Sequence, residues 1–295
     1  MQDSIIEKEL LHNYRDHLLS IKAESQDMSR VLALRPSGLP VCPVDFFIRH
    51  ANYGASRVLD MRGAFFVTIG SAVHEVVQTY LAPSGKFLAR WECLICGKLR
   101  ECSMKHECCD FQMKYHEIII DIPFKGGRIV GHIDAVFRDS KGRYWIVDYK
   151  TCSVLGYPLK KKDPSRAYLE QIEAYAYTLY VQYGILVHGV ALMFIRRDNP
   201  NEPMIYHHVV PKERHSKIER RLSKYMAMHQ EVLKVKTKEE ALDLLRYGKC
   251  KNKYCKTCKT TVERSLLLRA YERGLKLGHL PIGGSGETKK RSSNS

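Results

Sequence analysis

Long apolar segments are missing from this sequence, in which no run reaches the roughly 18 consecutive apolar residues that a membrane-spanning helix needs. The opening stretch, MQDSIIEKELLHNYRDHLL, is too rich in charged residues for a secretory signal peptide. There is also no internal repeat. These absences predict a soluble protein of the cytoplasm, associated with the nucleoid, that has no membrane partner.

Acidic residues are in short supply, since 32 Asp and Glu stand against 48 Lys and Arg and leave a formal net charge of +16. Such an excess attracts polyanions over long range and releases counterions when it neutralises phosphates. Nucleic acid is therefore the first candidate partner, and a soluble basic protein without such a partner is the alternative. The 295 residues, 44% of them hydrophobic and 27% charged, suffice for one large core or two smaller ones.

Cysteine, in contrast, is abundant, with ten residues. Reducing thiol pools keep cytoplasmic sulfurs free, so a disulfide framework is not expected and metal binding is favoured. The cysteines form two groups, while Cys42 and Cys152 stand alone. The first group is Cys93, Cys96, Cys102, Cys108 and Cys109, and the second is Cys250, Cys255 and Cys258.

The order of periodic segments predicts an α/β fold. An amphipathic helix is expected to lead the chain, a loop is expected to turn into a helix at about Pro43, and strand patterns begin at residue 115. The segment 86–114 lacks a clear period, and 159–166 is expected to be a basic loop. Helices are predicted at 4–24, 70–81, 167–184 and, as two basic helices, 212–247. Strands are predicted at 115–123, 128–137 and 143–150, as an antiparallel meander, and at 188–197 and 203–210.

The third of these strands, RYWIVDYKTCS (143–153), ends in two opposite charges. Side chains alternate along a strand, so Asp148 and Lys150 share one face. A structural salt bridge at a strand end is one interpretation. However, Asp134 in the preceding strand can reach the same point, and two carboxylates close together favour a hard cation such as Mg²⁺ or Mn²⁺ between them. Lys150 beside that ion could orient water or stabilise charge on a phosphate, which is the chemistry of metal-assisted phosphodiester hydrolysis.

Four short motifs occur in an order that resembles the PD-(D/E)XK nucleases, and within them the RecB-like exonucleases that include the CRISPR-associated nuclease of spacer acquisition. The resemblance extends from about residue 37 to 258. It implies a restriction-endonuclease-like core, in which helices flank a mixed central sheet. The motifs are GSAVHEVV (70–77), GHIDAV (131–136), VDYKT (147–151) and QIEAYAY (171–177).

This resemblance also implies roles for single residues. His74, Asp134 and Asp148 would ligate the divalent metal, together with the carbonyl oxygen of Tyr149, and Lys150 would assist the attacking water. Gln171 and Tyr175, four residues apart on one helical face, would act near the DNA backbone and the lysine. Taken alone, His74 would be a partly buried surface histidine, and Gln171 and Tyr175 a solvated helix edge. Glu117 could add a further carboxylate, or could simply be a solvated acid at a strand entry.

The downstream cysteines follow a C-x4-C-x2-C pattern, which suits an iron-sulfur cluster or zinc and lacks a fourth ligand. The resemblance implies that Cys42 supplies that ligand to Cys250, Cys255 and Cys258, and that the group is a four-iron four-sulfur cluster. Such a site would staple a basic helical lobe to the nuclease core. Structural zinc is the alternative.

The upstream cysteines predict a small zinc-ribbon-like insertion. Cys93 and Cys96, followed by Gly97, resemble a zinc knuckle, because C-x2-C brings two sulfurs to one tetrahedral metal. His106 and Cys109 have the matching gap for the second pair, and Cys102 and Cys108 are other candidates. A plain loop with reduced thiols is the alternative.

The function predicted from these motifs is a Mg²⁺- or Mn²⁺-dependent exonuclease that degrades single-stranded DNA or DNA ends, in the 5′ to 3′ direction by kinship. A non-catalytic DNA-binding or assembly module is the alternative, and the first helix could dock a protein partner. The predicted parts are an amphipathic helix (1–36), a helical part of the nuclease (37–85), the zinc-binding insertion (86–114), the catalytic core (115–210), the cluster lobe (211–275) and a disordered tail (276–295).

Overall fold

The computed structural model describes residues 32–39, 42, 61–81, 84–105, 108–109, 113–154, 156–162, 164–199 and 201–234. Contacts divide the chain into two units, one formed by residues 1–39 and 59–223 and the other by 40–58 and 224–295. The first unit contains every predicted residue of the nuclease site and is described below. The predicted first helix, the second basic helix, the tail, His106 and the downstream cysteines lie outside the described residues, whereas Cys42 is described and buried.

The described helices include none that combines the length and apolarity required to span a bilayer.

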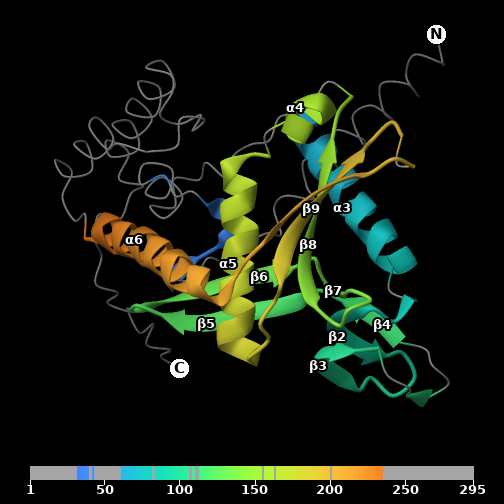
Figure 1. The fold of residues 1–295 in the computed structure, drawn as a ribbon, viewed down its shortest axis with the longest axis horizontal. Coiled ribbons are helices and arrows are strands. Elements are labelled where there is room, and N and C mark those ends of the chain that lie inside the picture. Colours follow the sequence, from blue (N-terminus) through green and yellow to red (C-terminus); the bar gives the residue numbers. More distant parts are fainter. Residues whose placement is uncertain are drawn as a thin grey trace, which may run out of the picture. The chain divides into compact units, whose positions relative to one another are not determined.

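A seven-stranded mixed sheet is the larger of two sheets in the first unit (Figure 1). Its strand order is β10-β9-β8-β7-β2-β3, with β4 also paired to β2. All of its pairs are antiparallel except β8 with β9, which run parallel. The strands are β2 (Phe87–Cys93), β3 (Leu99–Met104), β4 (Met113–His116), β7 (Ala135–Arg138), β8 (Tyr144–Cys152), β9 (Gly189–Arg196) and β10 (Met204–Val209).

A smaller sheet has the order β1-β6-β5, in which β6 pairs antiparallel with β5 and parallel with β1. The chain passes from β4 to β5 at Glu117 and returns from β6 to β7 at Asp134, so these two acids lie at the changes between the sheets. The strands are β1 (Ala33–Leu34), β5 (Ile118–Phe124) and β6 (Gly127–Ile133).

This break at Asp134 corrects the predicted meander. The expected strand 128–137 is two strands in different sheets, so the predicted meander divides into two separate antiparallel pairs, β5 with β6 and β7 with β8. The physical reason is tertiary, because β6 finds its partner in the small sheet while β7 finds its partner in the large one.

Two further segments differ from the sequence expectations. The aperiodic stretch 86–114 contains β2, β3 and β4, and β2 is almost wholly buried, so its side chains do not alternate. The expected basic loop contains a short helix, α4 (Gly156–Lys162). The structure contains the two strands predicted at 188–197 and 203–210, which are β9 and β10. It also contains the helix predicted before them and the helix predicted around His74.

The central helix α5 (Arg166–Tyr183) contacts strands of both sheets and the 3-10 turn η1 (Pro36–Gly38). It ends where Gly184 adopts a left-handed φ of +68° and donates its N–H to the carbonyl of Tyr180, a conformation that glycine adopts without strain. A Cβ added to Gly131 of β6 would lie 2.9 Å from the Tyr175 hydroxyl. A glycine is therefore needed there for α5 to lie this close to β6.

A second helix, α3 (Met61–Leu81), contacts β8. Val77 and Leu81 pack with Tyr149 of β8 and with Phe87 of β2. The side chains of Val147 and Tyr149 thus belong to this cluster, while Asp148, on the other face, meets Gln171 of α5. The alternation predicted for β8 is confirmed by these contacts.

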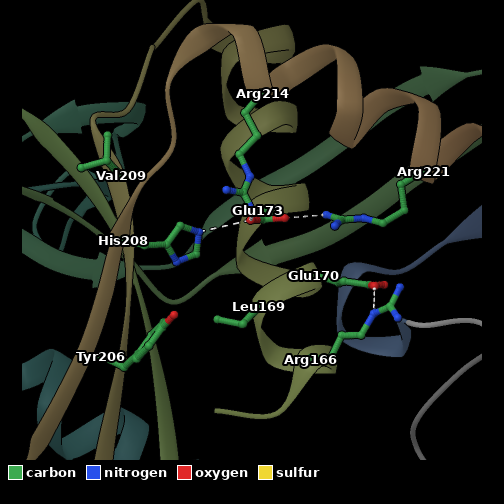
Figure 2. Close-up of a pocket in the computed structure, with 9 residues that line it drawn as sticks. All are labelled: Arg166, Leu169, Glu170, Glu173, Tyr206, His208, Val209, Arg214 and Arg221. Atoms are coloured by element: carbon green, nitrogen blue, oxygen red, sulfur yellow. Dashed lines mark hydrogen bonds and ion pairs between the residues drawn. The ribbon is translucent and has the colours of Figure 1, made fainter. Parts of the chain in front are cut away.

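A buried carboxylate fixes α5 to the edge of the large sheet (Figure 2). Glu173 is 3% exposed and lies between His208 of β10, at 3.1 Å, Arg221, at 2.9 Å, and Arg214, at 2.5 Å. Arg214 ends the 3-10 turn η4 (Lys212–Arg214), and Arg221 belongs to α6 (His215–Leu233). Burial alone would raise the pKa of Glu173, but the hydrogen bonds from His208 and Arg221 outweigh it and lower that pKa below its ordinary value.

Replacing Glu173 by Gln is expected to lower the free energy of opening of α5 by about 2 kcal/mol, because it leaves two guanidinium groups without their counter-charge. The effect is smaller than for a fully buried pair, since Arg214 is 46% exposed. Hydrogen exchange of the α5 amides measures it.

The matched control is Glu231→Gln, which removes the carboxylate of an ion pair whose two side chains are 69% and 68% exposed and should leave exchange unchanged. Because the pKa of Glu173 is lowered in the folded protein, its stabilisation is present at neutral pH and is lost as the pH falls through the folded pKa, which lies below the ordinary value of a glutamate. The difference between wild type and Glu173→Gln should therefore shrink in acid, and a difference independent of pH would contradict this account.

Candidate active site

The site lies where the pairing of β7 with β8 ends. The two strands pair from Arg138 with Tyr144 to Ala135 with Val147, and beyond Val147 no strand among the described residues pairs with the same edge of β8. Side chains take over there: Asp134 accepts a hydrogen bond from the Tyr149 N–H at 2.8 Å, and His74 Nε2 lies 2.8 Å from the Tyr149 carbonyl oxygen. The strand end therefore fixes both predicted ligands through the backbone of one residue.

The bond to Tyr149 determines the proton position on His74. A carbonyl oxygen can only accept, so Nε2 carries a proton, and in the neutral form of the ring Nδ1 would present its lone pair. That Nδ1 lies 3.6 Å from Asp134 Oδ2, which is also an electron-rich atom. Two such atoms face each other stably when a cation lies between them, so this geometry fits a metal site. The carbonyl oxygen of Tyr149 was predicted as a metal ligand. In the structure it accepts a hydrogen bond from His74.

Glu117 completes a group of three metal-ligating residues. One ligand atom from each of His74, Glu117 and Asp134 lies within 4.8 Å of the others. Glu117 accepts a hydrogen bond from Gln78 Nε2 at 3.0 Å, and its other oxygen lies 3.4 Å from His132 Nδ1. The hydrogen bond to His132, which is the main cause, and that from Gln78 lower the pKa of Glu117, so the group is a carboxylate at neutral pH.

Asp148 is not part of that group and makes its own contacts. It is 2% exposed, accepts a hydrogen bond from Gln171 Nε2 at 3.0 Å, and forms an ion pair with Lys150 Nζ at 2.6 Å. Burial raises the pKa of Asp148, and Lys150 opposes the shift. Burial and the charge of Asp148 together raise the pKa of Asp134 well above its ordinary value. The two acids therefore repel each other, which a bound cation would relieve.

The predicted motif on α5 divides between two environments. Gln171 reaches Asp148 directly, whereas Tyr175, 4% exposed, packs against Gly131. Both side chains are buried, so neither forms a solvated helix edge. Lys150 lies 5.2 Å from the ring centre of Tyr168, and Lys160 of α4 lies 4.9 Å from the same ring. A second cation is thus held near the predicted catalytic lysine.

Two residues of the site were not singled out in the sequence. Gln78 binds Glu117 and also lies 3.4 Å from the carbonyl oxygen of Asp134, and the Tyr115 hydroxyl donates to that carbonyl at 2.7 Å. The spacing of His74 and Gln78, four residues apart on a helix, is a signal that could have found the glutamine. No sequence signal marks Tyr115.

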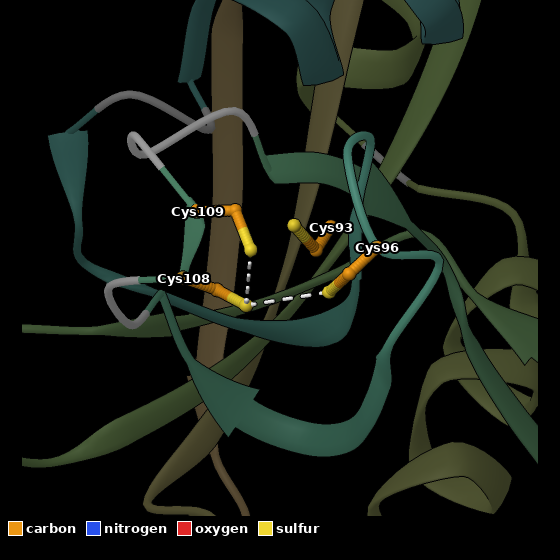
Figure 3. Close-up of side chains that lie close together, drawn as sticks. All are labelled: Cys93, Cys96, Cys108 and Cys109. Atoms are coloured by element: carbon orange, nitrogen blue, oxygen red, sulfur yellow. Dashed lines mark hydrogen bonds between the residues drawn. The ribbon is translucent and has the colours of Figure 1, made fainter.

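Four of the five upstream cysteines lie close together, as Figure 3 shows: Cys93 ends β2, Cys96 follows it, and Cys108 and Cys109 lie between β3 and β4. Three members of this group, Cys93, Cys96 and Cys109, were predicted ligands. The fourth member is Cys108, which the sequence offered as another candidate. Cys102 is half-buried and is not part of the group. The four sulfurs of Cys93, Cys96, Cys108 and Cys109, called the thiol cluster below, lie within 4.8 Å of one another.

Two solved structures are similar to this chain at low sequence identity. The crystal structure of SSO0001 aligns with a TM-score of 0.41 and 15% identity, over 84% of this chain and 95% of that one. The crystal structure of an alkaline exonuclease from Laribacter hongkongensis aligns with a TM-score of 0.39 and 12% identity, over 77% of this chain and 99% of that one. Comparison with curated proteins found no match.

The comparison with protein families agrees with the motifs on α3, β8 and α5. The model of the PD-(D/E)XK nuclease superfamily matches residues 37–261, which is most of the chain and includes His74, Asp134, Asp148 and Lys150. The protein therefore belongs to the PD-(D/E)XK nuclease superfamily.

Proposed function

We propose that this protein is a metal-dependent deoxyribonuclease that removes nucleotides from the ends of single-stranded DNA, in the 5′ to 3′ direction, as a RecB-like member of its superfamily. The observation that carries the proposal is the convergence of His74, Glu117 and Asp134 beside the Asp148–Lys150 pair. A hard-oxygen donor set with one imidazole suits Mg²⁺ or Mn²⁺.

The ligands of the divalent ion would be His74 Nδ1 and carboxylate oxygens of Asp134 and Glu117, with Asp148 as the neighbouring acid. When bound, such an ion activates water and neutralises charge on a phosphate. The protein fixes these donors before binding, since the backbone of Tyr149 holds His74 and Asp134, and Gln78 holds Glu117. Little reorganisation is then needed when DNA arrives.

Lys150 supplies the second part of the chemistry. Its ammonium group is held by Asp148, and Gln171 binds the other oxygen of that carboxylate, so the lysine has a fixed position at the strand end. There it would donate a hydrogen bond to the attacking water or to the phosphate oxygen on which charge develops. The side chain remains 19% exposed, which leaves it accessible to substrate.

The charge of the chain supports a polyanionic substrate. The formal net charge is +16. Lys150 and Lys160 both lie near the ring of Tyr168, so Lys160 is placed to contact a phosphate near the reacting one. A non-catalytic DNA-binding module is the competing function. It is disfavoured because the hydrogen bonds that orient His74, Asp134 and Asp148 are all present.

We propose, in addition, that Cys42, Cys250, Cys255 and Cys258 bind a four-iron four-sulfur cluster. The support is the C-x4-C-x2-C spacing and the upstream cysteine of the resembled exonucleases.

Asp134→Asn and Lys150→Ala are each expected to reduce Mg²⁺- or Mn²⁺-dependent degradation of labelled single-stranded DNA by about a hundredfold or more, because the first weakens a ligand of the metal and the second removes a positive charge at the reacting phosphate. Strands labelled at either end report the rate and the polarity together. Asp198→Asn and Lys141→Ala, on exposed turns, are the matched controls and should retain activity. Equal rates in wild type and both site variants would leave only the DNA-binding function.

The ligand set is tested by Mn²⁺ binding, followed by electron paramagnetic resonance. Glu117→Gln should weaken Mn²⁺ affinity on the order of tenfold or more, as His74→Ala should, because both remove a donor from the group within 4.8 Å. Asp198→Asn, which removes an exposed acid paired with Arg196 on a turn, is the control. Unchanged affinity in Glu117→Gln, with a loss in Asp148→Asn, would exclude Glu117 and make Asp148 the ligand.

For the cluster, protein purified without oxygen is expected to be brown and to contain iron, and Cys255→Ala should be colourless. Iron analysis and visible absorption measure this, with Cys102→Ser as the control that keeps the colour. The wild type could instead contain no iron and hold a zinc ion that Cys255→Ala loses. That result would show zinc in place of the cluster.

A further inference from the structure

The sulfur separations in the thiol cluster match a tetrahedral metal site. Cys96 Sγ lies 3.7 Å from Cys108 Sγ, which lies 3.9 Å from Cys109 Sγ. Four sulfurs bound at about 2.3 Å to one tetrahedral Zn²⁺ are about 3.8 Å apart, the edge of the tetrahedron. A disulfide would instead need about 2.05 Å.

The backbone around Cys93 and Cys96 forms a tight turn. Cys93 ends β2, its N–H donates to the Lys98 carbonyl at 3.0 Å, and its carbonyl accepts the N–H of Gly97 at 2.8 Å. Gly97 has a left-handed φ of +68°, which a residue with a side chain adopts only with strain. The turn brings the two sulfurs of the C-x2-C pair to the same side, toward Cys108 and Cys109 (Figure 3).

In contrast to the buried strand β2, the strand β3 and the turn beside the thiol cluster have little apolar core to hold them. None of the residues of β3 is buried, and Leu94 and Ile95 in the turn are 60% and 54% exposed. The small buried cluster here consists of Ala89 and Trp91, against which Met113 and Tyr115 pack. A segment with so few buried apolar side chains is commonly stabilised by a bound metal.

We propose that the thiol cluster binds one Zn²⁺ ion, and that this ion positions β4 and therefore Glu117. All four donors are sulfurs, which favour zinc over the hard cations that suit the carboxylates of the active site. The described residues thus offer two candidate metal sites of different chemistry.

The connection to Glu117 runs through β4. This strand pairs with β2, and the pairs run from Cys93 with Met113 to Arg90 with His116. Because Cys93 is also a ligand, the metal and the pair of Cys93 with Met113 hold the same end of the ladder. Further along, Tyr115 packs edge-on against Trp91 at 5.5 Å and donates to the carbonyl of Asp134. Glu117 is the next residue after β4. Loss of the ion would loosen the entry to this strand and change the position of the Glu117 carboxylate.

The test is metal analysis of the full-length protein by mass spectrometry. We expect one zinc ion per chain in the wild type and its loss in Cys93→Ser and in Cys108→Ser. Cys102→Ser, in the same segment and outside the cluster, is the matched control and should keep the ion. Replacement by Co²⁺ should give the intense visible bands of a tetrahedral thiolate site.

Zinc binding is measured independently of nuclease activity, so its failure and that of the proposed function are distinguishable. If the Ser variants do not fold, release of zinc from wild type by a mercurial thiol reagent, followed with a chromogenic chelator, gives the same stoichiometry. Full zinc in Cys108→Ser with loss in His106→Ala would overturn the four-cysteine set. Iron at this site, lost in Cys108→Ser, would overturn the choice of metal. The link to Glu117 is supported if Cys108→Ser also weakens Mn²⁺ binding, and unchanged Mn²⁺ affinity would refute that link.

Discussion

The burial of Asp148 is the constraint on which the rest of the site depends. A carboxylate that is 2% exposed is stable as an anion only with compensating donors, and here these are the ammonium of Lys150 and the amide of Gln171. Lys150 comes from the same face of β8, and Gln171 from α5. The central helix α5 must therefore lie close to the end of β8. On the side of Tyr175, Gly131 of β6 permits the close approach of α5 to β6. One buried charge thus specifies where a helix and two strands meet.

The second determinant is the pair of points at which the chain changes sheets. Glu117 and Asp134 interrupt strands that would otherwise continue, and their side chains lie near each other because Ile118 pairs with Ile133 between them. A residue at such a break keeps its backbone out of the ladder and is free to direct its side chain to one point. His74, from α3, meets them there through the carbonyl of Tyr149.

Much of this arrangement could be predicted from the sequence, since the underlying periods are local. The alternation in β8 places Asp148 and Lys150 together, and Gly184 marks the end of α5. The break at Asp134 has no Gly, Pro or Asn beside it as a local turn signal, and the division of segment 128–137 follows from strand partners far away in sequence. The strand β2 was missed for a similar reason: Arg90 and Glu92 look incompatible with a buried strand until Glu101 and His116 pair with them.

A cation bound by Glu117 and Asp134, as proposed, would have a mechanical role besides its chemical one. Each acid belongs to a different crossing between the same two sheets, so one ion bound by both would act as a cross-link at that junction. A change in the angle between the sheets would alter the separation of the two carboxylates and with it the affinity for the ion. Any force that DNA exerts on one sheet would then be transmitted to the metal.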